Sequence, residues 1–453
     1  MSLPARLIWT GHLAVQTVTQ PRFPYRSIAA IERAQRRRIR SMIRHAYETV
    51  PYYRMTMDRL GLSPANVKSA ADLARLPLID RQAVQRDPRH FVSRAFPLEH
   101  CRRVQTGGSS GAPLTAFHAP PGLRATGYGE RWQPLRDALA GRRWRPRVLF
   151  IASPMSAQRA AAHAIAQRIL LPKWIRRQSR EMSLLDPPAK ALAAMNEFRP
   201  HVVHSYGSYL EALFVHAYES GADFHRPGVV VYAADALPES ARRLISETLG
   251  IPVLSHYGAV EASPMGFECE AHRGYHLNVD LHPVRIADEA GEDVADGESG
   301  EIVVSNLVNR GTVLLNYRLG DVARFLSGPC PCGRSLPMIS FLEGRPGDWV
   351  ATRSGERMHP QGVRTLFTDE QEIRRYQVTQ RSLTHFAVVL VTATRCDRER
   401  LEGRLAKKFA ERLGAGTTIE VSFATDLPRT RLGKVRTVIG LPDAAERATA
   451  RAT

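Results

Sequence analysis

The sequence contains little cysteine and no long apolar run. Its five cysteines are too few, and odd in number, for a disulfide framework in a chain of 453 residues. A stretch of about eighteen consecutive apolar residues, as a transmembrane helix needs, is also missing. The apolar N-terminal stretch is interrupted by Gly11, His12 and Gln16 and has no clear cleavage site, so we do not expect a signal peptide. We therefore predict a cytoplasmic protein without a membrane span.

Lysine is scarce as well, although the net charge is +19. The lysines of the chain are Lys68, Lys173, Lys190, Lys407, Lys408 and Lys434. The excess of arginine suggests a general residue bias, with many arginines on solvated faces. The densest run, RAQRRRIR at 33–40, lies among apolar residues spaced as in an amphipathic helix, and we expect that helix to face solvent or a partner. Strong positive charge also fits nucleic acid, but no nucleic-acid-binding motif supports that interpretation.

The length exceeds what one hydrophobic core usually serves, so we expect two domains. In the first, apolar runs alternate with helical patterns. The predicted strands and helices are strand 147–153, helix 188–198, strand 228–233, helix 238–250 and strand 251–258. This alternation predicts a parallel sheet with helices on both faces. The later segments GEIVVSNL and TVLLNYRLGDVARF predict a more antiparallel β region.

A polar, glycine-rich stretch at 343–356 marks the predicted domain boundary. Beyond it, a compact β-α-β unit is predicted from strand 385–393, helix 398–414 and strand 418–424. The expected fold class is therefore α/β. A large N-terminal α/β domain (1–344) would contain parallel sheets and a β region, and a small mobile C-terminal α+β domain (345–453) would follow it.

The segment QTGGSSGAPLT at 105–115 carries three glycines, several hydroxyl groups and no charge. Glycine loses backbone entropy inside a helix or strand, so we expect a loop. Such loops expose backbone N–H groups that bind phosphate oxygens. The Gly-Lys-Ser/Thr of a Walker loop is absent, which disfavours a P-loop NTPase, and an ordinary surface turn is the alternative. The candidate phosphate-binding residues are Thr106, Gly107, Gly108, Ser109, Ser110 and Gly111.

Four later segments carry side chains that suit a nucleotide site. SHYGAVEAS places Tyr257 and Glu261 after a predicted strand, where α/β proteins bind ligands. NYRLGDVARF holds Asp321 in a glycine turn, and EGRPGD holds Arg345. LPRTRLGKVR contains Lys434, which is informative in an arginine-rich chain because the two cations are not interchangeable.

In this order and at these separations, the five motifs resemble those of the adenylate-forming superfamily of acyl- and aryl-CoA synthetases and adenylation domains. Within it, YETVPYYR, CPCGR and the ending LPRTRLGKVRTVIG look most like the phenylacetate–coenzyme A ligase branch, which includes capsule-biosynthesis relatives. The resemblance runs from about residue 30 to about residue 440. Five ordered motifs are far more specific than any single one.

The resemblance implies a site for ATP. The glycine-rich loop would hold the phosphates, with Gly107 in place of the family's usual serine. That exchange removes one hydroxyl donor and leaves the backbone N–H groups. Ala234 and Asp235 match the segment that lies along adenine, and Tyr257 would stack on the base. Asp321 would accept both ribose hydroxyls, a role that suits an ionised carboxylate.

The resemblance also implies the chemistry. Glu261 would hold Mg²⁺, Arg345 would contact the ribose or a phosphate, and Asp348 would mark the hinge between domains. Lys434 would reach the α-phosphate and the attacking carboxylate. Mg²⁺, the loop N–H groups and Lys434 would then offset the negative charge that develops on the phosphoryl oxygens, and no general base would be needed. Rotation of the small domain would then move Lys434 out of the site and let a thiol attack the acyl adenylate.

The expected function is an ATP-dependent carboxylate ligase that transfers the acyl group to coenzyme A or a carrier-protein pantetheine. An aromatic acid is favoured by the resemblance, and His204, Tyr206 and His256 are candidates for the acyl site, with simple core packing as their alternative. A biosynthetic adenylating enzyme with an amine or hydroxyl acceptor is the second reading. From another class, a nucleic-acid-binding or structural protein on a degenerate fold is disfavoured by intact Asp321 and Lys434. A homodimer is compatible with either reading.

Cys-Pro-Cys followed by glycine forms a tight knuckle whose sulfurs face one point, and a Cys/His pair lies upstream in CEAHRGYH. We therefore predict a structural zinc site from Cys269, Cys330, Cys332 and one histidine. His272 and His276 compete for the fourth position, and the resemblance favours His276. Reduced thiols without a metal are the alternative.

Overall fold

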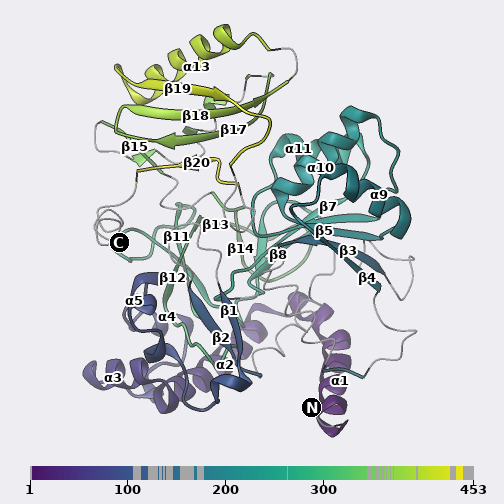
Figure 1. Ribbon diagram of the computed structural model, residues 1–453. Coiled ribbons are helices and arrows are strands. Elements are labelled where there is room, and N and C mark those ends of the chain that lie inside the picture. Colours follow the sequence, from purple (N-terminus) through teal and green to yellow (C-terminus); the bar gives the residue numbers. More distant parts are fainter. Residues whose placement is uncertain are drawn as a thin grey trace. The chain divides into compact units, whose positions relative to one another are not determined.

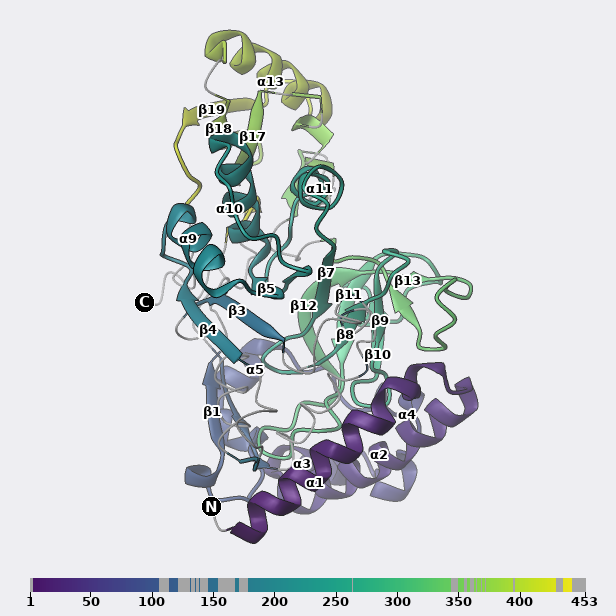
Figure 2. The ribbon, with the colours of Figure 1, turned by 90° about the vertical axis from the view of Figure 1, so that its right-hand side faces the viewer.

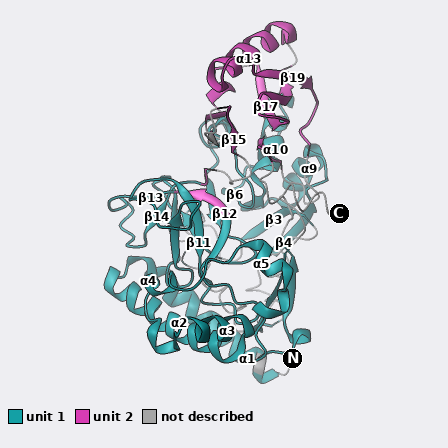
Figure 3. Ribbon diagram, turned by 90° about the vertical axis from the view of Figure 1, so that its left-hand side faces the viewer, with its two compact units in different colours: residues 1–319, 324–341 teal, residues 320–323, 342–453 magenta. Residues whose placement is uncertain are grey.

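The chain divides into two compact units, which Figure 3 colours separately: residues 1–319 with 324–341, and residues 320–323 with 342–453. The structure is a computed structural model (Figure 1). It describes residues 3–105, 114–120, 131, 135, 138, 146–153, 168–170, 178–262, 264–343, 349–353, 357–358, 362–363, 365–367, 369–370, 372–393, 396–428 and 435–441. The functional division into domains 1–344 and 345–453, with a mobile small domain, stays a prediction.

Helices form the N-terminal part of the first unit (Figure 2). Apolar residues three and four positions apart share one side of a helix, so α2 buries Ile39, Met42 and Ile43 while most of its arginines are exposed, as predicted. Among the described residues, no helix is both long enough and apolar enough to cross a membrane. The helices of this part are α1 Leu3–Thr19, η1 Gln20–Tyr25, α2 Ile28–Thr49, α3 Pro51–Arg59, η2 Pro64–Asn66, α4 Ala70–Leu73, α5 Arg81–Arg86, η3 Pro88–Phe91 and η4 Leu98–His100.

A nine-stranded sheet runs through the first unit in the order β13-β14-β9-β8-β7-β6-β5-β3-β4. From β4 to β7, each strand is parallel to the next. From β7 to β13, each strand is antiparallel to the next, so β7 has one neighbour of each kind. The strands predicted to form a parallel sheet all lie in its parallel half, which confirms that expectation, and the antiparallel half was not predicted. The strands are β3 Arg147–Ala152, β4 Gln178–Ser183, β5 Val202–Ser205, β6 Val229–Tyr232, β7 Val253–Tyr257, β8 Gly266–Glu268, β9 Tyr275–Leu277, β13 Phe325–Leu326 and β14 Met338–Ile339.

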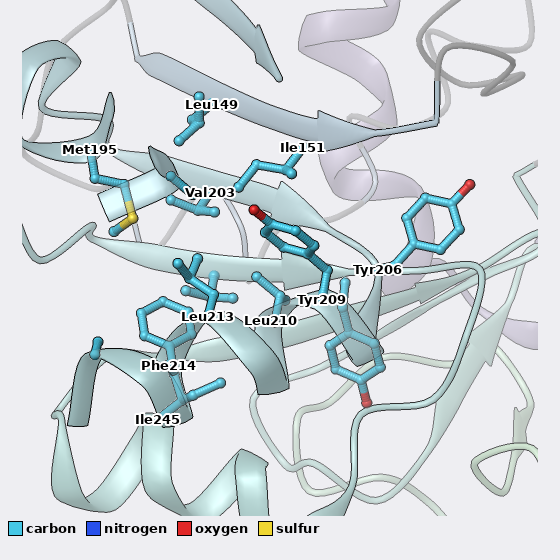
Figure 4. Close-up of a cluster of buried hydrophobic side chains, with 14 of the residues drawn as sticks. Leu149, Ile151, Met195, Val203, Tyr206, Tyr209, Leu210, Leu213, Phe214 and Ile245 are labelled. Carbon is cyan, nitrogen blue, oxygen red and sulfur yellow. The ribbon is translucent and has the colours of Figure 1, made fainter. Parts of the chain in front are cut away.

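Three helices pack on the parallel half: α9 Pro188–Phe198, α10 Gly207–Ser220 and α11 Glu239–Arg243. Figure 4 shows Leu213 and Phe214 of α10 in one buried cluster with Leu149 and Val203 of the sheet. The predicted helix 188–198 is α9 with the same limits. The predicted helix 238–250 is α11 followed by a π-helical turn, Leu244–Thr248.

Two smaller β structures accompany this sheet. Strands β1 Arg102–Gln105 and β2 Thr115–His118 form an antiparallel pair. Strands β10 Val284–Ala287, β11 Gly300–Val304 and β12 Tyr317–Ala323 form a three-stranded sheet, in which β10 and β11 are antiparallel. The antiparallel β region predicted here is thus present.

The second unit contains a four-stranded sheet in the order β19-β18-β17-β20. The predicted β-α-β unit is present, because β18 and β19 are parallel and α13 lies between them in the sequence. Leu405 and Phe409 of α13 pack with Phe386 of β18 in its core. The elements are β15 Val350–Ala351, β16 Arg357–Met358, η8 Thr365–Phe367, β17 Ile373–Gln380, β18 His385–Thr392, α13 Arg398–Leu413, β19 Thr418–Phe423 and β20 Val438–Ile439.

Candidate functional site

Two histidines meet at the carboxyl ends of the parallel strands, the edge where α/β sheets bind ligands. His204 near the end of β5 and His256 near the end of β7 place their Nε2 atoms 3.2 Å apart. Burial lowers the pKa of His256 to about 4, so this imidazole is neutral at pH 7. The His204 ring also lies 5.3 Å from the ring of Phe150 on β3. Both predicted acyl-site histidines thus share one location, bordered by an aromatic ring.

The segment after β6 lies against the start of α10. Gly207 opens that helix, and an added Cβ would lie 2.4 Å from the carbonyl oxygen of Ala236, so only glycine allows this approach. The close contact lets Ser208 donate its hydroxyl to Asp235 at 2.6 Å. Ala234 has a φ of 76°, which is uncommon for a residue with a side chain and is often found at functional sites.

Tyr206 precedes α10 and is buried. Burial raises its pKa to about 12, with the nearby Asp235 carboxylate adding to the shift. The phenol therefore stays protonated at pH 7 and can donate a hydrogen bond. The segment predicted to lie along adenine and the predicted acyl-site residue Tyr206 thus lie near each other.

Tyr257 ends β7 and Glu261 lies in the loop after it, and both are buried. The ring of Tyr257 stacks on that of Tyr275 at 5.7 Å. The carbonyl oxygen of Glu261 accepts a hydrogen bond from Nδ2 of Asn306 at 2.7 Å. These contacts fix the backbone of the loop that would present the magnesium-binding carboxylate.

The same loop is joined to the β1–β2 pair. His118 at the end of β2 donates from Nε2 to the carbonyl oxygen of Val260 at 3.1 Å, since a carbonyl can only accept. Burial lowers the pKa of His118, which keeps it neutral. The strands flanking the predicted phosphate loop are therefore bound to the loop that carries Glu261.

A further loop supports β2 from the other side. Thr312 donates its backbone N–H to the carbonyl oxygen of Phe117 at 2.8 Å, and its hydroxyl accepts from the N–H of Phe117 at 2.8 Å. An added Cβ on Gly311 would lie 2.3 Å from that same carbonyl. Asn309 also donates to it, at 3.0 Å. Sequence reasoning missed this support, because its residues form no chemical motif.

Asp321 lies on β12 and is buried. Gly320 before it has a φ of +82°, a conformation that favours glycine. The glycine turn predicted at this place is instead part of a strand. The remaining predicted residues, which lie outside the described part of the chain, are Thr106, Gly107, Gly108, Ser109, Ser110, Gly111, Arg345, Asp348 and Lys434.

A second cluster gathers three cysteines and one histidine. One ligand atom from each of Cys269, His276, Cys330 and Cys332 lies within 4.8 Å of all the others. The sulfurs of Cys269 and Cys330 are 3.6 Å apart, close to the roughly 3.8 Å that tetrahedral zinc with Zn–S bonds of about 2.3 Å requires. Nε2 of His276 lies 3.2 Å from the sulfur of Cys332. The donor set and its spacing fit zinc.

The ring of His276 is oriented by a backbone group. Its Nδ1 lies 3.0 Å from the carbonyl oxygen of Leu336 and must donate to it. Nε2 then carries the lone pair and faces the sulfurs, which is the arrangement found in metal-binding histidines.

The thiols of the cluster differ in acidity. Burial raises the pKa of Cys269 to about 12 and also raises the pKa of Cys330. Burial opposes ionisation of Cys332 too, but hydrogen bonds from the backbone and guanidinium of Arg334 bring its pKa below the usual value. Because metal binding displaces thiol protons, the affinity of the cluster for metal should rise with pH.

The rival fourth ligand, His272, lies elsewhere. Its Nδ1 is 2.6 Å from a carboxylate oxygen of Glu268, and its side chain is half exposed. Glu268 is fully buried and also accepts from Arg242 and from the N–H of Ser255, the latter at 2.7 Å. Sequence reasoning missed this network, since an isolated glutamate at the end of a three-residue strand forms no pattern.

The chain matches known proteins in sequence and in fold. Residues 178–309 match the AMP-binding enzyme family, and residues 350–440 match the CapK C-terminal domain. A phenylacetate-coenzyme A ligase of Thermus thermophilus is 23% identical over 450 residues, covering 90% of this chain and 96% of that protein. A phenylacetate-coenzyme A ligase of Aromatoleum evansii is 26% identical over 346 residues, covering 73% of this chain and 74% of that protein.

Solved structures share the fold. A 2-hydroxyisobutyryl-CoA ligase in the postadenylation state, in complex with 2-HIB-AMP, has a TM-score of 0.71 at 19% identity and covers 94% of this chain and 92% of that chain. An anthranilate CoA ligase in complex with anthranoyl-AMP has a TM-score of 0.54 at 16% identity, covering 80% and 68%. The fold, the two family matches and relatives along nine tenths of the sequence lead to one assignment. The chain is similar to the adenylate-forming superfamily, in its phenylacetate–coenzyme A ligase-like branch.

Proposed function

We propose that this chain is an AMP-forming acid–thiol ligase that joins an aromatic carboxylic acid to coenzyme A. One structural observation carries the proposal: the hydrogen bond from His118 to Val260 ties the strands flanking the phosphate loop to the loop that follows Tyr257 and carries Glu261. The β1–β2 pair that flanks the expected phosphate loop is thereby attached to the loop expected to bind magnesium, which supports one shared nucleotide site.

The reaction has two steps. A carboxylate oxygen attacks the α-phosphorus of ATP, an acyl adenylate forms and pyrophosphate leaves. A thiolate then attacks the acyl carbon, a thioester forms and AMP leaves. In the first step, N–H groups of the phosphate loop and the ammonium group of Lys434 offset negative charge on the phosphoryl oxygens. Glu261 would hold Mg²⁺, which when bound adds further positive charge at the same oxygens.

The nucleotide would be positioned by three side chains. Tyr257 would lie against adenine, Asp321 would accept the ribose hydroxyls, and Arg345 would contact the ribose or a phosphate. Asp235 would act from the segment along adenine, where Ser208 already fixes its carboxylate at 2.6 Å. A fixed carboxylate loses little conformational freedom when a ligand binds.

The acyl group would lie against His204, Tyr206 and His256. The neutral imidazole of His256, with the rings of His204 and Phe150 beside it, offers flat ring faces that suit an aromatic ring. The ligases for phenylacetate, indoleacetate and anthranilate among the similar proteins are named for aromatic acids. We therefore favour an aryl or arylacetic acid as substrate.

The test is a pyrophosphate-release assay with a panel of carboxylic acids, with and without coenzyme A. We expect release with aromatic acids, and a thioester detected by mass spectrometry when coenzyme A is present. Release that leads to no thioester, but to acyl transfer onto an amine, a hydroxyl group or a carrier-protein pantetheine, would select that acceptor instead. Absence of acid-dependent pyrophosphate release across the panel would contradict ligase activity.

We also propose that Cys269, His276, Cys330 and Cys332 hold a structural zinc ion. Three sulfurs and one imidazole fill a tetrahedral zinc site and leave no open position for catalysis. Both Cys330 and Cys332 lie between β13 and β14, whose paired strands have two residues each. A metal ion there would stabilise a segment with little apolar core of its own.

A further inference from the structure

One face of α2 and the loop at Arg310 border a basic cavity of about 340 Å³ that is open to solvent, since its α2 arginines are exposed. Residues at intervals of three, four and seven share one side of a helix. Arg37, Arg40 and Arg44 follow this spacing, and their side chains line the cavity. The lining is completed by Ser41, His45, Glu48 and Arg310.

Arg310 reaches this cavity from a distant part of the sequence, and two hydrogen bonds hold it there. His45 donates from Nε2 to the carbonyl oxygen of Arg310 at 3.1 Å, and Nη2 of Arg310 donates to the hydroxyl of Ser41 at 2.6 Å. Burial lowers the pKa of His45, so its ring is neutral and serves as a fixed donor. The position of the fourth arginine is therefore built into the fold.

The arginines of the cavity differ from their neighbours on α2. Arg36 pairs with Glu32 at 3.3 Å, and Arg38 reaches Asp280 at 3.5 Å. Within the described residues, no carboxylate lies within ion-pair distance of the four cavity arginines, and Glu48 is the single acid of the lining. Burial lowers the pKa of Arg310, as expected when a cation is partly removed from water. The cavity thus gathers four arginines beside one glutamate, and none of these arginines is in an ion pair among the described residues.

We propose that this cavity binds a phosphate or diphosphate group. Planar guanidinium groups donate in pairs to phosphate oxygens, and converging arginines are the usual means of binding them. The volume is at the lower end of the roughly 300–1,000 Å³ of small-molecule sites, and because the cavity is open to solvent, the phosphate group could be carried by a small molecule or by the head group of a phospholipid. None of the lining residues belongs to the proposed nucleotide or acyl site, so the inference stands apart from the ligase activity.

Binding of pyrophosphate, measured by calorimetry at physiological salt, tests the proposal. The variants are Arg44→Glu and, as a second member of the cavity, Arg37→Glu. The control Arg33→Glu makes the same charge change at an exposed position of α2 outside the cavity. Losing a charge-assisted contact and adding repulsion should weaken binding at least about tenfold in both cavity variants. The control should bind as the wild type does, and unchanged thermal unfolding would show that each variant is folded.

A second measurement distinguishes the source of the phosphate. Co-sedimentation with vesicles that contain phosphatidic acid is compared with vesicles of phosphatidylcholine alone. Pyrophosphate binding that depends on Arg44 supports a soluble ligand, and phosphatidic-acid binding that depends on Arg44 without pyrophosphate binding supports a lipid head group. The proposal is overturned if the wild type binds neither probe, or if Arg33→Glu weakens binding as much as Arg44→Glu does.

Discussion

The Nε2 atoms of His204 and His256 lie 3.2 Å apart above the end of the intervening strand β6. A hydrogen bond between two imidazoles needs one N–H and one lone pair, so the pair is stable when at least one ring is neutral. Burial lowers the pKa of His256 from 6.5 to about 4 in the folded protein. The unfolded chain therefore binds more protons than the folded one between these two pH values.

Stability should consequently fall as the pH is lowered from about 6.5 to about 4. At about 1.36 kcal/mol for each pKa unit, His256 contributes roughly 3 kcal/mol to this loss. Urea unfolding of wild type and His256→Gln across this range measures it, and the variant should show the smaller pH dependence. His100→Gln at an exposed position is the control. Equal pH dependence in all three proteins would show that His256 titrates normally.

Lys434 is expected to act in adenylate formation. Lys434→Ala should slow pyrophosphate release at least about a hundredfold, because one lost electrostatic contact to a transition state typically costs that much. Lys434→Arg should not restore the rate, since a guanidinium fork does not replace a compact ammonium group. Lys407→Ala, on α13, serves as the control. Near-normal adenylate formation in Lys434→Ala would remove this lysine from the mechanism.

Asp321 is expected to bind the ribose of ATP. Asp321→Ala should weaken ATP binding by roughly 1.5–3 kcal/mol for each charge-assisted hydrogen bond lost. Calorimetric titration with ATP measures the change, and Asp296→Ala, in the polar segment before β11, provides a control. An unchanged affinity for ATP would mean that the motif around Asp321 has been assigned the wrong role.

The Cys/His cluster should yield about one zinc per chain in elemental analysis, as a closed tetrahedral site does. Cys332→Ser should lower the unfolding temperature more than it changes the rate, because structural zinc contributes folding free energy directly. The two histidines provide a matched pair: His276→Ala should lose zinc, and His272→Ala should retain it. A well-folded, fully active, metal-free protein would refute the site.

The apolar pattern predicts the parallel half of the large sheet well. Strand β6 is buried along its whole length, and its sequence is a continuous apolar run. Helix α9 begins and ends at the limits of the helical apolar pattern in the sequence. The antiparallel half is built from strands of two or three residues, too short to show any period. Strand β17 was missed because IRRYQVTQ places two adjacent arginines in a strand.

Individual residues of the candidate site could be proposed from the sequence, but their arrangement could not. The sequence places His204 and His256 at strand ends, yet their meeting depends on a strand order that only the tertiary fold defines. The choice between His272 and His276 likewise depended on Glu268, which holds His272 at 2.6 Å. Buried partners of this kind have no sequence spacing, because they are brought together by packing of separate elements.

The two edges of the nine-stranded sheet have a consequence for self-association. One edge is β13, which has two residues, and the other is β4, whose sequence QSREMS is polar and carries Arg180 and Glu181. An edge that is very short or charged is a poor template for a strand of another molecule. Sheet extension from one copy to the next is therefore disfavoured at both ends. For the same reason, a homodimer joined through the edges of this sheet is disfavoured.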